Sequence, residues 1–349
     1  MLIYYLLFLI VLYCIMSENY KNSNLIVVIL CFLIYCIAAF RSYSVGSDTY
    51  SYIEEYIADT SFGRDLDFGF AYFNQFLSEL GLSPRLYLMI VSLLIFIPVL
   101  IFICQYTKKY RAFTILLYLT ISNFSFNLTG IRQSIAVGLV LIGLVLYKVV
   151  DKKLIGYVCV LGLILLACSF HNSARLCLML IPLLWLSNKT ILHYKFVRVV
   201  LFVLPIFVLF SSKAIASIVN YFMISRYEQY EAVFGDANLV AYIVVPYCIY
   251  LYVWYLFFRS KNKNWQLRFC FYCSIIYVCI AACTLYMPML GRLEYYYSLP
   301  LICLVSNLTT EQTVSDRKLF MFIISVLSMM LFLISTPGGT LRIDNYSFF

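Results

Sequence analysis

The sequence predicts an all-α membrane protein, a polytopic bundle of about twelve membrane-spanning helices, and three observations support this prediction. Hydrophobic residues make up 64% of the 349 positions and charged residues only 12%, whereas soluble domains hold near half and near a quarter. Apolar runs recur from one end of the chain to the other. No Pro-, Gly- or Ser-rich linker separates them, so a single integral membrane domain over residues 1–349 is expected.

The predicted spans follow these apolar runs, and a helix needs about 20 residues to cross the hydrocarbon core. Several runs are shorter, which predicts short or tilted helices with interfacial ends. The first run lacks a basic n-region and a cleavage site, so we interpret it as a span and not as a signal peptide. The predicted spans are 2–16, 25–40, 86–106, 112–128, 131–147, 154–170, 174–187, 196–210, 239–258, 267–286, 294–308 and 319–335.

Basic residues in the connections predict the orientation, because they gather in cytoplasmic loops. One set of connections is rich in Lys and poor in acids, and we assign it to the cytoplasm, which places both termini outside. This set holds Lys21, Lys108, Lys109, Arg111, Lys148, Lys152, Lys153, Lys189, Lys195, Arg198, Arg259, Lys261, Lys263, Arg268, Arg317 and Lys318. The other set is almost purely Arg, and holds Arg41, Arg64, Arg85, Arg132, Arg175, Arg226, Arg292, Arg342 and Lys213.

The bias toward Arg on the outer side favours an anion-binding role. A guanidinium is a planar fork that binds phosphate or carboxylate oxygens with two parallel hydrogen bonds. Arg41, Arg132, Arg175 and Arg292 adjoin predicted helix ends, so they can converge at one depth. The alternative is that these side chains snorkel to the interface and pair with outer acids.

The stretch 127–136 is the most informative part of the chain. It places Arg132 between two apolar runs, where a charge is costly unless it lies at the interface, faces a wet cavity or has an anionic partner. Gly130 supplies a tight reversal. The alternative is an interfacial Arg that closes a hairpin.

Two long outer connections are expected, 42–84 and 211–238. The first carries Gly46-Ser47-Asp48-Thr49, and then an amphipathic piece whose apolar residues predict a helix along the membrane surface. Those residues are Tyr72, Phe73, Phe76, Leu77 and Leu80. The second connection has a similar stripe before Arg226, formed by Ile215, Ile218, Val219 and Phe222.

Few side chains are suited to proton transfer. His171 ends a span on the outer side and either accepts a proton near neutral pH or is a hydrogen-bonded helix-end histidine. Asp48 either orients or deprotonates a hydroxyl, or caps the helix that follows it. Arg292 and Glu294 either pair with each other or bind a ligand's anion and hydroxyls.

No metal or cofactor site is expected. The 13 Cys lie in or beside apolar runs without metal-ligand spacing to His or carboxylate. The chain has no P-loop, Rossmann fingerprint, GxSxG or HExxH, and no nucleic-acid partner is indicated. Chemistry is therefore expected at the outer face, on a substrate that arrives already activated.

The chain resembles the EpsG/Wzy group of polysaccharide (O-antigen) polymerases, the membrane enzymes that lengthen O-antigen or exopolysaccharide chains. Four pieces carry the resemblance, and it spans most of the chain. They are Gly46-Ser47-Asp48-Thr49 with Tyr52 and Tyr56, Arg132-Gln133 with Ala136, Phe170-His171-Asn172-Ser173-Ala174, and Gly291-Arg292 with Tyr296.

The resemblance implies a GT-C-like, hexosyltransferase-type glycosyltransferase in the bacterial inner membrane with its active site facing the periplasm. Its substrates would be glycans on undecaprenyl pyrophosphate, and a chain-length regulator and a flippase would be partner proteins. Arg132, with Asp48 or His171 as base, would be catalytic. The pyrophosphate-binding residues would be Arg41, Arg132, Gln133, Arg175, Arg292, Glu294 and Tyr296.

Three other classes of membrane protein compete with this interpretation. A flippase for the same lipid-linked oligosaccharide would need cations buried in mid-span, and the predicted spans hold almost none. An O-acyltransferase would need a His early in the chain, and the first 170 residues contain none. An O-antigen ligase differs little from a polymerase in sequence.

Overall fold

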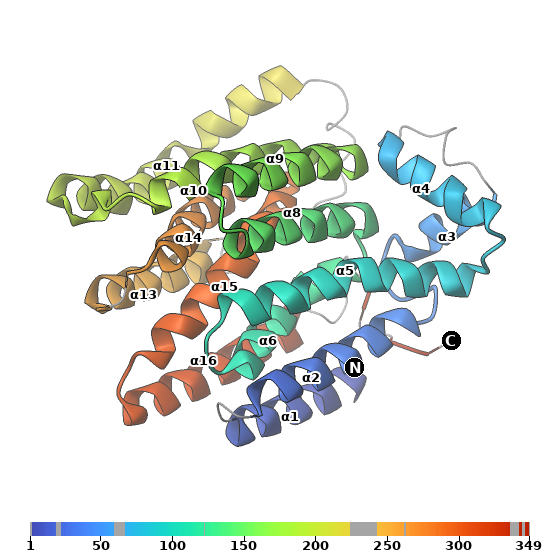
Figure 1. The fold of residues 1–349 in the computed structure, drawn as a ribbon, viewed down its shortest axis with the longest axis horizontal. Coiled ribbons are helices and arrows are strands. Elements are labelled where there is room, and N and C mark those ends of the chain that lie inside the picture. The colour runs from blue at the N-terminus through green and yellow to red at the C-terminus, as the bar shows by residue number, and fades with distance from the viewer. Residues whose placement is uncertain are drawn as a thin grey trace. The chain divides into compact units, whose positions relative to one another are not determined.

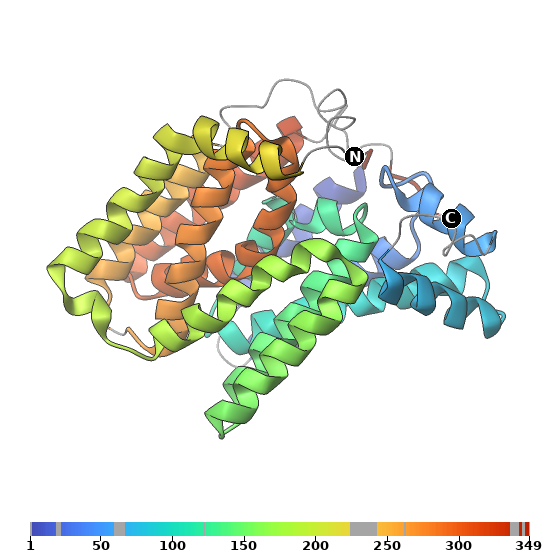
Figure 2. The same ribbon diagram turned by 90° about the horizontal axis from the view of Figure 1, so that it is seen from above.

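The computed structural model describes residues 2–18, 22–58, 67–121, 123–223, 243–261, 263–335, 342–343 and 346–348. Within these ranges the protein is helical and contains no strand, apart from an isolated antiparallel bridge between Arg41 and Phe348 (Figure 1). Viewed from above, the same ribbon shows the long helices α8 and α9 lying side by side (Figure 2). The prediction of an all-α fold is confirmed.

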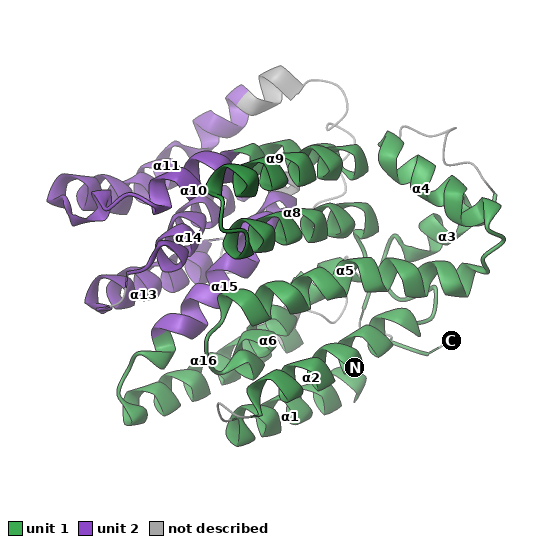
Figure 3. Ribbon diagram, viewed as in Figure 1, with its two compact units in different colours: residues 1–178, 309–349 green, residues 179–308 purple. Residues whose placement is uncertain are grey.

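The helices form two compact units (Figure 3). Unit 1 contains Met1–Leu178 and Thr309–Phe349, and unit 2 contains Met179–Leu308. Each unit is described below by itself. The single integral membrane domain expected from the sequence stays a prediction.

Unit 1 is built from helices that come from both ends of the chain. They are α1 (Leu2–Ser17), α2 (Ser23–Ala39), α3 (Thr49–Ile57), α4 (Phe68–Glu79), α5 (Pro84–Tyr106), α6 (Arg111–Thr120), α7 (Asn123–Asn127), α8 (Ile131–Val149), α9 (Lys153–Phe170) and α16 (Val314–Ser335). A 3₁₀ segment, η1 (Asn172–Met179), follows α9.

Unit 2 is centred on α14 (Trp265–Thr284), which packs against α10 (Leu180–Ser187), α11 (Lys195–Met223) and α13 (Val245–Arg259). Two 3₁₀ segments, η2 (Ile191–His193) and η4 (Pro288–Glu294), precede α11 and α15 (Tyr295–Thr310). Aromatic rings fill the space between α13 and α14, where Phe257 stacks on Phe271 with centroids 4.2 Å apart.

Each predicted span contains a helix, although residues 239–242 of the span 239–258 lie outside the described residues. Three spans differ most from the prediction. The run 112–128 is divided into α6 and α7: α6 ends at Thr120, whose hydroxyl donates to the Leu116 carbonyl at 2.8 Å, and α7 begins at Asn123. The run 174–187 begins as the 3₁₀ segment η1. The run 196–210 continues to Met223, so the apolar stripe from Ile215 to Phe222 belongs to the same helix and does not form a separate surface helix.

Five helices are long and apolar enough to cross a membrane: Pro84–Tyr106, Ile131–Val149, Lys153–Phe170, Lys195–Ile218 and Trp265–Thr284. Four further apolar helices are shorter, namely Leu2–Ser17, Ser23–Ala39, Arg111–Thr120 and Asn172–Ser187. The predicted number of about twelve spans stays a prediction. The remainder of the second outer connection, including Arg226, lies outside the described residues.

The Lys-rich connections of unit 1 meet at one end, which we call the Lys-rich end. Glu18 is buried there and accepts hydrogen bonds from the backbone N–H groups of Arg111 (2.8 Å) and Ala112 (2.9 Å). A carboxylate at this place satisfies the first amides of α6 and interacts favourably with the helix dipole. Arg317, at the start of α16, lies over the ring of Tyr110 at the same end.

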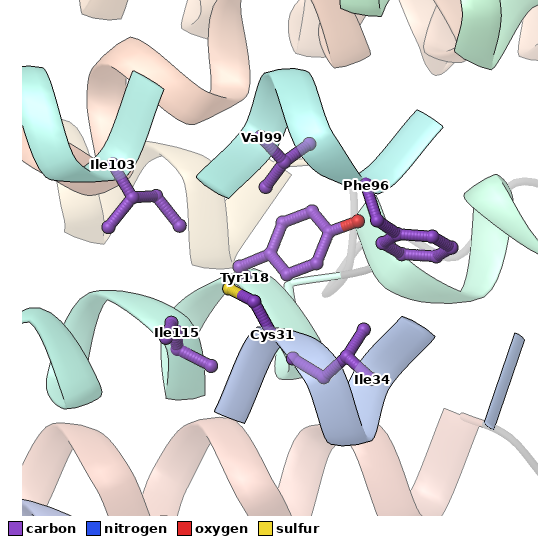
Figure 4. A pocket seen from close by; sticks show the side chains of 7 residues that line it. All are labelled: Cys31, Ile34, Phe96, Val99, Ile103, Ile115 and Tyr118. Atoms are coloured by element: carbon purple, nitrogen blue, oxygen red, sulfur yellow. The ribbon is translucent and has the colours of Figure 1, made fainter. Parts of the chain in front are cut away.

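The core of unit 1 between α2, α5 and α6 leaves only a small void of about 10 Å³ (Figure 4). Apart from one sulfur and one hydroxyl, carbon atoms line it, and the volume is about that of one water molecule. It is therefore a packing defect and not a substrate site. Its lining residues are Cys31, Ile34, Phe96, Val99, Ile103, Ile115 and Tyr118.

Candidate functional site

The first outer connection folds over the opposite end of unit 1, which we call the Arg-rich end. Arg41 follows α2 and is the anchor of this connection. Its side chain is 1% exposed, and it donates hydrogen bonds to the carbonyl of Leu128 at 3.0 Å and to the hydroxyl of Thr49 at 3.4 Å. Burial lowers the pKa of Arg41 to about 10, so the guanidinium is still charged at neutral pH. The Arg41 guanidinium therefore makes its hydrogen bonds to the protein itself.

Gly46 lets the connection approach the loop before α8. Its φ of +92° is a conformation that side chains rarely adopt, and an added Cβ would lie 2.4 Å from the Leu128 carbonyl oxygen. The Thr49 hydroxyl donates to that same carbonyl at 3.0 Å. The Gly46 turn, which belongs to one of the motifs that carry the family resemblance, is therefore in direct contact with the loop just before Arg132.

Asp48 occupies the N-cap position of α3, but its side chain makes no capping hydrogen bond. Its Oδ1 accepts a hydrogen bond from the Ser47 hydroxyl at 2.9 Å, and the residue is half-buried. Asp48 therefore occupies the N-cap position, but its side chain does not cap the helix.

Helix α4 packs against the C-terminal end of α9. A Cβ on Gly69 would lie 2.2 Å from the Ser169 hydroxyl, so only glycine allows this approach. Phe73 packs on Phe170 with centroids 6.0 Å apart. As a result, the residue just before α4, Asp67, lies next to the residue just after α9.

That contact creates a cluster of four side chains from distant parts of unit 1, the Asp67 cluster: Tyr52, Asp67, Arg132 and His171. Asp67 Oδ2 lies 3.4 Å from His171 Nδ1 and 3.8 Å from the Arg132 guanidinium. Arg132 Nε lies 3.4 Å from the Tyr52 hydroxyl. The Asp67 side chain is 9% exposed, while Arg132 and His171 keep 24% and 23%.

The geometry lets the cluster hold an anion and accept a proton. When Nδ1 of a histidine faces a carboxylate, the carboxylate fixes the tautomer and leaves Nε2 as the basic nitrogen. The Arg132–Asp67 distance exceeds hydrogen-bond length, so the guanidinium fork is not committed to Asp67. Burial raises the pKa of Tyr52, an effect that Arg132 opposes, and the phenol therefore remains a neutral hydrogen-bonding group.

The structure places the other predicted residues differently. Gln133 is buried, and Arg175 is exposed on η1, one turn beyond His171. Arg292, Glu294 and Tyr296 lie in unit 2, where Tyr296 is fully buried and Glu294 Oε1 accepts a hydrogen bond from Thr284 at 3.3 Å. The meeting of Arg292 with Arg132 and Arg175 stays a prediction.

Asp67 is the residue that sequence reasoning missed. It immediately precedes the amphipathic stretch, as an N-cap would, and its backbone has the extended conformation of an N-cap without a side-chain capping bond. A carboxylate that starts a surface helix but does not cap it is available for other partners. Only the packing of α4 on α9 identifies His171 as that partner.

The amphipathic stretch is helical as predicted, but its apolar residues divide between two faces. Phe70, Ala71 and Leu77, together with the polar Asn74, are buried inside unit 1. The outward face carries a stripe of exposed apolar side chains at i, i+4 spacing: Phe68, Tyr72, Phe76 and Leu80. This outward stripe suits a helix at a membrane surface.

The described residues contain no group of three or more His, Cys, Asp or Glu side chains suited to a metal ion. Within the Asp67 cluster, only Asp67 and His171 are of ligand type. The cationic group that the cluster presents is Arg132.

Taken together, the apolar helices and the ionisable cluster at one helix end define a polytopic helical membrane protein with a polar site at one end of its spans. The chain belongs to the EpsG family, whose sequence model matches residues 24–348. This is the family of Wzy-like polymerases, which makes the chain a membrane polysaccharide polymerase by family. No curated protein and no solved structure matches it.

Proposed function

We propose that this polymerase is a glycosyltransferase that moves the growing glycan from undecaprenyl pyrophosphate onto a new lipid-linked repeat unit at the periplasmic face of the bacterial inner membrane. The family supports polymer synthesis. One observation supports the rest: Arg132 and His171 flank a single oxygen of Asp67 at the Arg-rich end of unit 1. An anion-binding group and a base candidate are thus neighbours.

Arg132 is proposed to bind the diphosphate of the donor. Its charge matches that of the leaving group, and its fork matches two phosphate oxygens. Electrostatic stabilisation aimed at charge that develops in the transition state is often worth about 3–4 kcal/mol, or 100- to 1,000-fold in rate. Arg175 and Arg292 are proposed as further diphosphate ligands, and Tyr52 orients Arg132 from its Nε side.

His171 is proposed as the base. Nε2 takes the proton of the acceptor hydroxyl, whose oxygen forms the new bond to the anomeric carbon of the donor glycan. The bond from that carbon to the diphosphate oxygen breaks, and the undecaprenyl diphosphate leaves with the electron pair. Asp67 holds the ring and stabilises the imidazolium that forms. Asp48 remains the second candidate base.

The test is a strain that lacks the chromosomal gene and carries plasmid copies of the wild type, His171→Ala or Arg132→Ala. Gel analysis of surface polysaccharide should show long chains for the wild type and a single repeat unit for both variants. Absence of any capped material would instead indicate a ligase. Loss of all periplasmic intermediate would indicate a flippase, and unaltered chain length in both variants would overturn the site assignment.

A further inference from the structure

A second polar site lies in unit 2, at the ends of its helices. It is a partly open hollow of about 230 Å³ lined by Thr190, Leu192, His193, Arg198, Phe258, Lys263 and Arg268. Helix α13 ends there, and α11 and α14 begin there. The hollow is smaller than pockets that enclose whole drug-sized ligands, which measure roughly 300–1,000 Å³. It therefore suits a small headgroup whose remainder stays outside.

Two cations of this hollow, Arg198 and Arg268, are oriented by backbone carbonyls, and neither forms an ion pair with a carboxylate among the described residues. Arg198 Nε donates to the Leu192 carbonyl at 2.6 Å, and Arg268 Nε donates to the Ser187 carbonyl at 2.6 Å. Neutral carbonyls fix the direction of a guanidinium and leave its charge in place. Among the described residues of unit 2 the only acid is Glu294, which lies in η4, beyond the other end of α14.

The helix termini add to the positive potential. Arg198 and Arg268 each lie in the first turn of a long helix, of 29 residues for α11 and 20 for α14. The N-terminal end of a helix carries a partial positive charge and unbonded N–H groups, which favour a phosphate. The ring centroid of Phe258 lies 5.1 Å from the Arg198 guanidinium and 5.8 Å from Lys263 Nζ.

The hollow lies at one end of α14. Helix α14 has 20 residues, a length of roughly 30 Å at 1.5 Å per residue, which matches the hydrocarbon core. The hollow adjoins its first turn, and η4 with Arg292 follows its last. Because the Lys-rich connections that form the hollow are predicted to be cytoplasmic, we place the hollow at the cytoplasmic leaflet.

The surface beside the hollow is apolar. The exposed residues Phe196, Val199, Val203 and Phe207 form one stripe along α11 from the level of Arg198. A ligand with a phosphate in the hollow would lay its tail along this stripe. We therefore propose that the hollow binds the headgroup phosphate of an anionic phospholipid from the cytoplasmic leaflet.

Intrinsic fluorescence gives a direct test in the full-length wild type, because all 3 Trp residues, Trp185, Trp254 and Trp265, lie in unit 2. Purified protein is placed in nanodiscs of phosphatidylcholine with or without phosphatidylglycerol, and unfolding is followed by Trp emission on heating. We expect phosphatidylglycerol to raise the midpoint, and inorganic phosphate or glycerol phosphate added to phosphatidylcholine discs to leave it unchanged. A rise with the soluble phosphates would overturn the lipid assignment, as would no rise with phosphatidylglycerol.

Variants then locate the effect by native mass spectrometry of lipid adducts. Arg198→Gln with Arg268→Gln should weaken phosphatidylglycerol binding by roughly fivefold for each cation removed. Arg259→Gln with Lys261→Gln removes the same charge from the adjoining connection but not from the hollow, and should change binding far less. Equal losses of phosphatidylglycerol binding in the two double variants would mean that the basic surface attracts the lipid in general, and would overturn the site. If the first pair does not fold, Arg198→Lys with Arg268→Lys replaces it, and is expected to retain charge but bind less well than wild type.

Discussion

Asp67 Oδ2 lies 3.4 Å from His171 Nδ1, although one residue precedes α4 and the other follows α9. Two features bring them together: the close approach that Gly69 allows at Ser169, and the packing of Phe73 on Phe170. The same carboxylate oxygen faces Arg132. The connection 42–84 therefore supplies Asp67 and Tyr52 to the cluster, while Arg132 lies at the start of α8 and His171 follows α9.

The first prediction concerns Asp67→Asn. An amide keeps the size of the side chain but not the charge that stabilises a protonated His171 and fixes its tautomer, so polymerisation should fall about 10- to 100-fold. The measurement is elongation of lipid-linked repeat units by purified protein across a range of pH. A change in the pH–rate profile is expected, which a purely structural loss would not produce.

Glu79→Gln is the matched control for this change. Glu79 is an exposed carboxylate at the other end of α4, and its described partner is Gln75, at 2.9 Å. The Glu79→Gln variant should retain the activity and the pH dependence of the wild type. Equal activity of Asp67→Asn and the wild type would remove Asp67 from the mechanism.

The second prediction compares two changes at Arg132. Arg132→Ala should lower the rate of elongation by about 100- to 1,000-fold, because a charge aimed at the leaving diphosphate is lost. Arg132→Lys keeps the charge but not the bidentate fork, and should lie between alanine and the wild type. A steady-state assay with varied donor concentration separates kcat from KM. An unchanged kcat in Arg132→Ala would show that the residue does not act in the transition state.

The third prediction separates Arg41 from Arg175, which the sequence places in one group. Arg41 is buried with its hydrogen bonds made to the protein, and a hydrogen bond to a charged group contributes about 1.5–3 kcal/mol. Arg41→Ala should therefore lower the unfolding temperature. Arg175 is exposed, so Arg175→Ala should leave that temperature unchanged and lower activity if it binds diphosphate.

A thiol-reactive dye can follow the unfolding of these unit 1 variants, because Cys31 and Cys177 are buried there. If Arg41→Ala melts like the wild type but makes no long polymer, the ligand role expected from the sequence is correct and the structural role is wrong. If Arg175→Ala retains full activity, Arg175 is no diphosphate ligand.

Sequence reasoning located the helices and the ends at which polar residues gather, because apolar runs and connection charges are local properties. It chose Arg132 because a charge beside a membrane span is costly without an anionic partner or a wet cavity, and His171 because an imidazole can accept a proton near neutral pH. It could not distinguish the buried Arg41 from the accessible Arg132, because each of them adjoins an apolar run. That difference depends on the Leu128 carbonyl, which only the folded loop brings to Arg41.

Asp67 is a second residue whose role the sequence does not reveal. The sequence marks it only as one acid in a long connection, and its partner is fixed by how α4 lies on α9. The division of the amphipathic stripe is a further example, since Leu77 is buried while Tyr72 and Phe76 are exposed. The spacing of the apolar residues predicts a helix, but the way in which that helix packs decides which of these residues face the protein.

The fourth prediction tests whether the Gly46 turn holds the site together. Gly46→Ala and Gly81→Ala both place a side chain at positive φ, +92° and +66°, which costs about 1–3 kcal/mol in either case. Only at Gly46 would the new Cβ also meet a backbone atom, the Leu128 oxygen at 2.4 Å, whereas nothing lies within 4 Å at Gly81. Gly46→Ala should therefore lower the unfolding temperature more than Gly81→Ala does. Gly46→Ala should also lower polymerase activity, because the new Cβ would displace the loop that holds Leu128, and this loop leads directly into α8 and Arg132. Equal unfolding temperatures and equal activities for the two variants would show that the contact between the Gly46 turn and the Leu128 carbonyl contributes nothing beyond its backbone conformation.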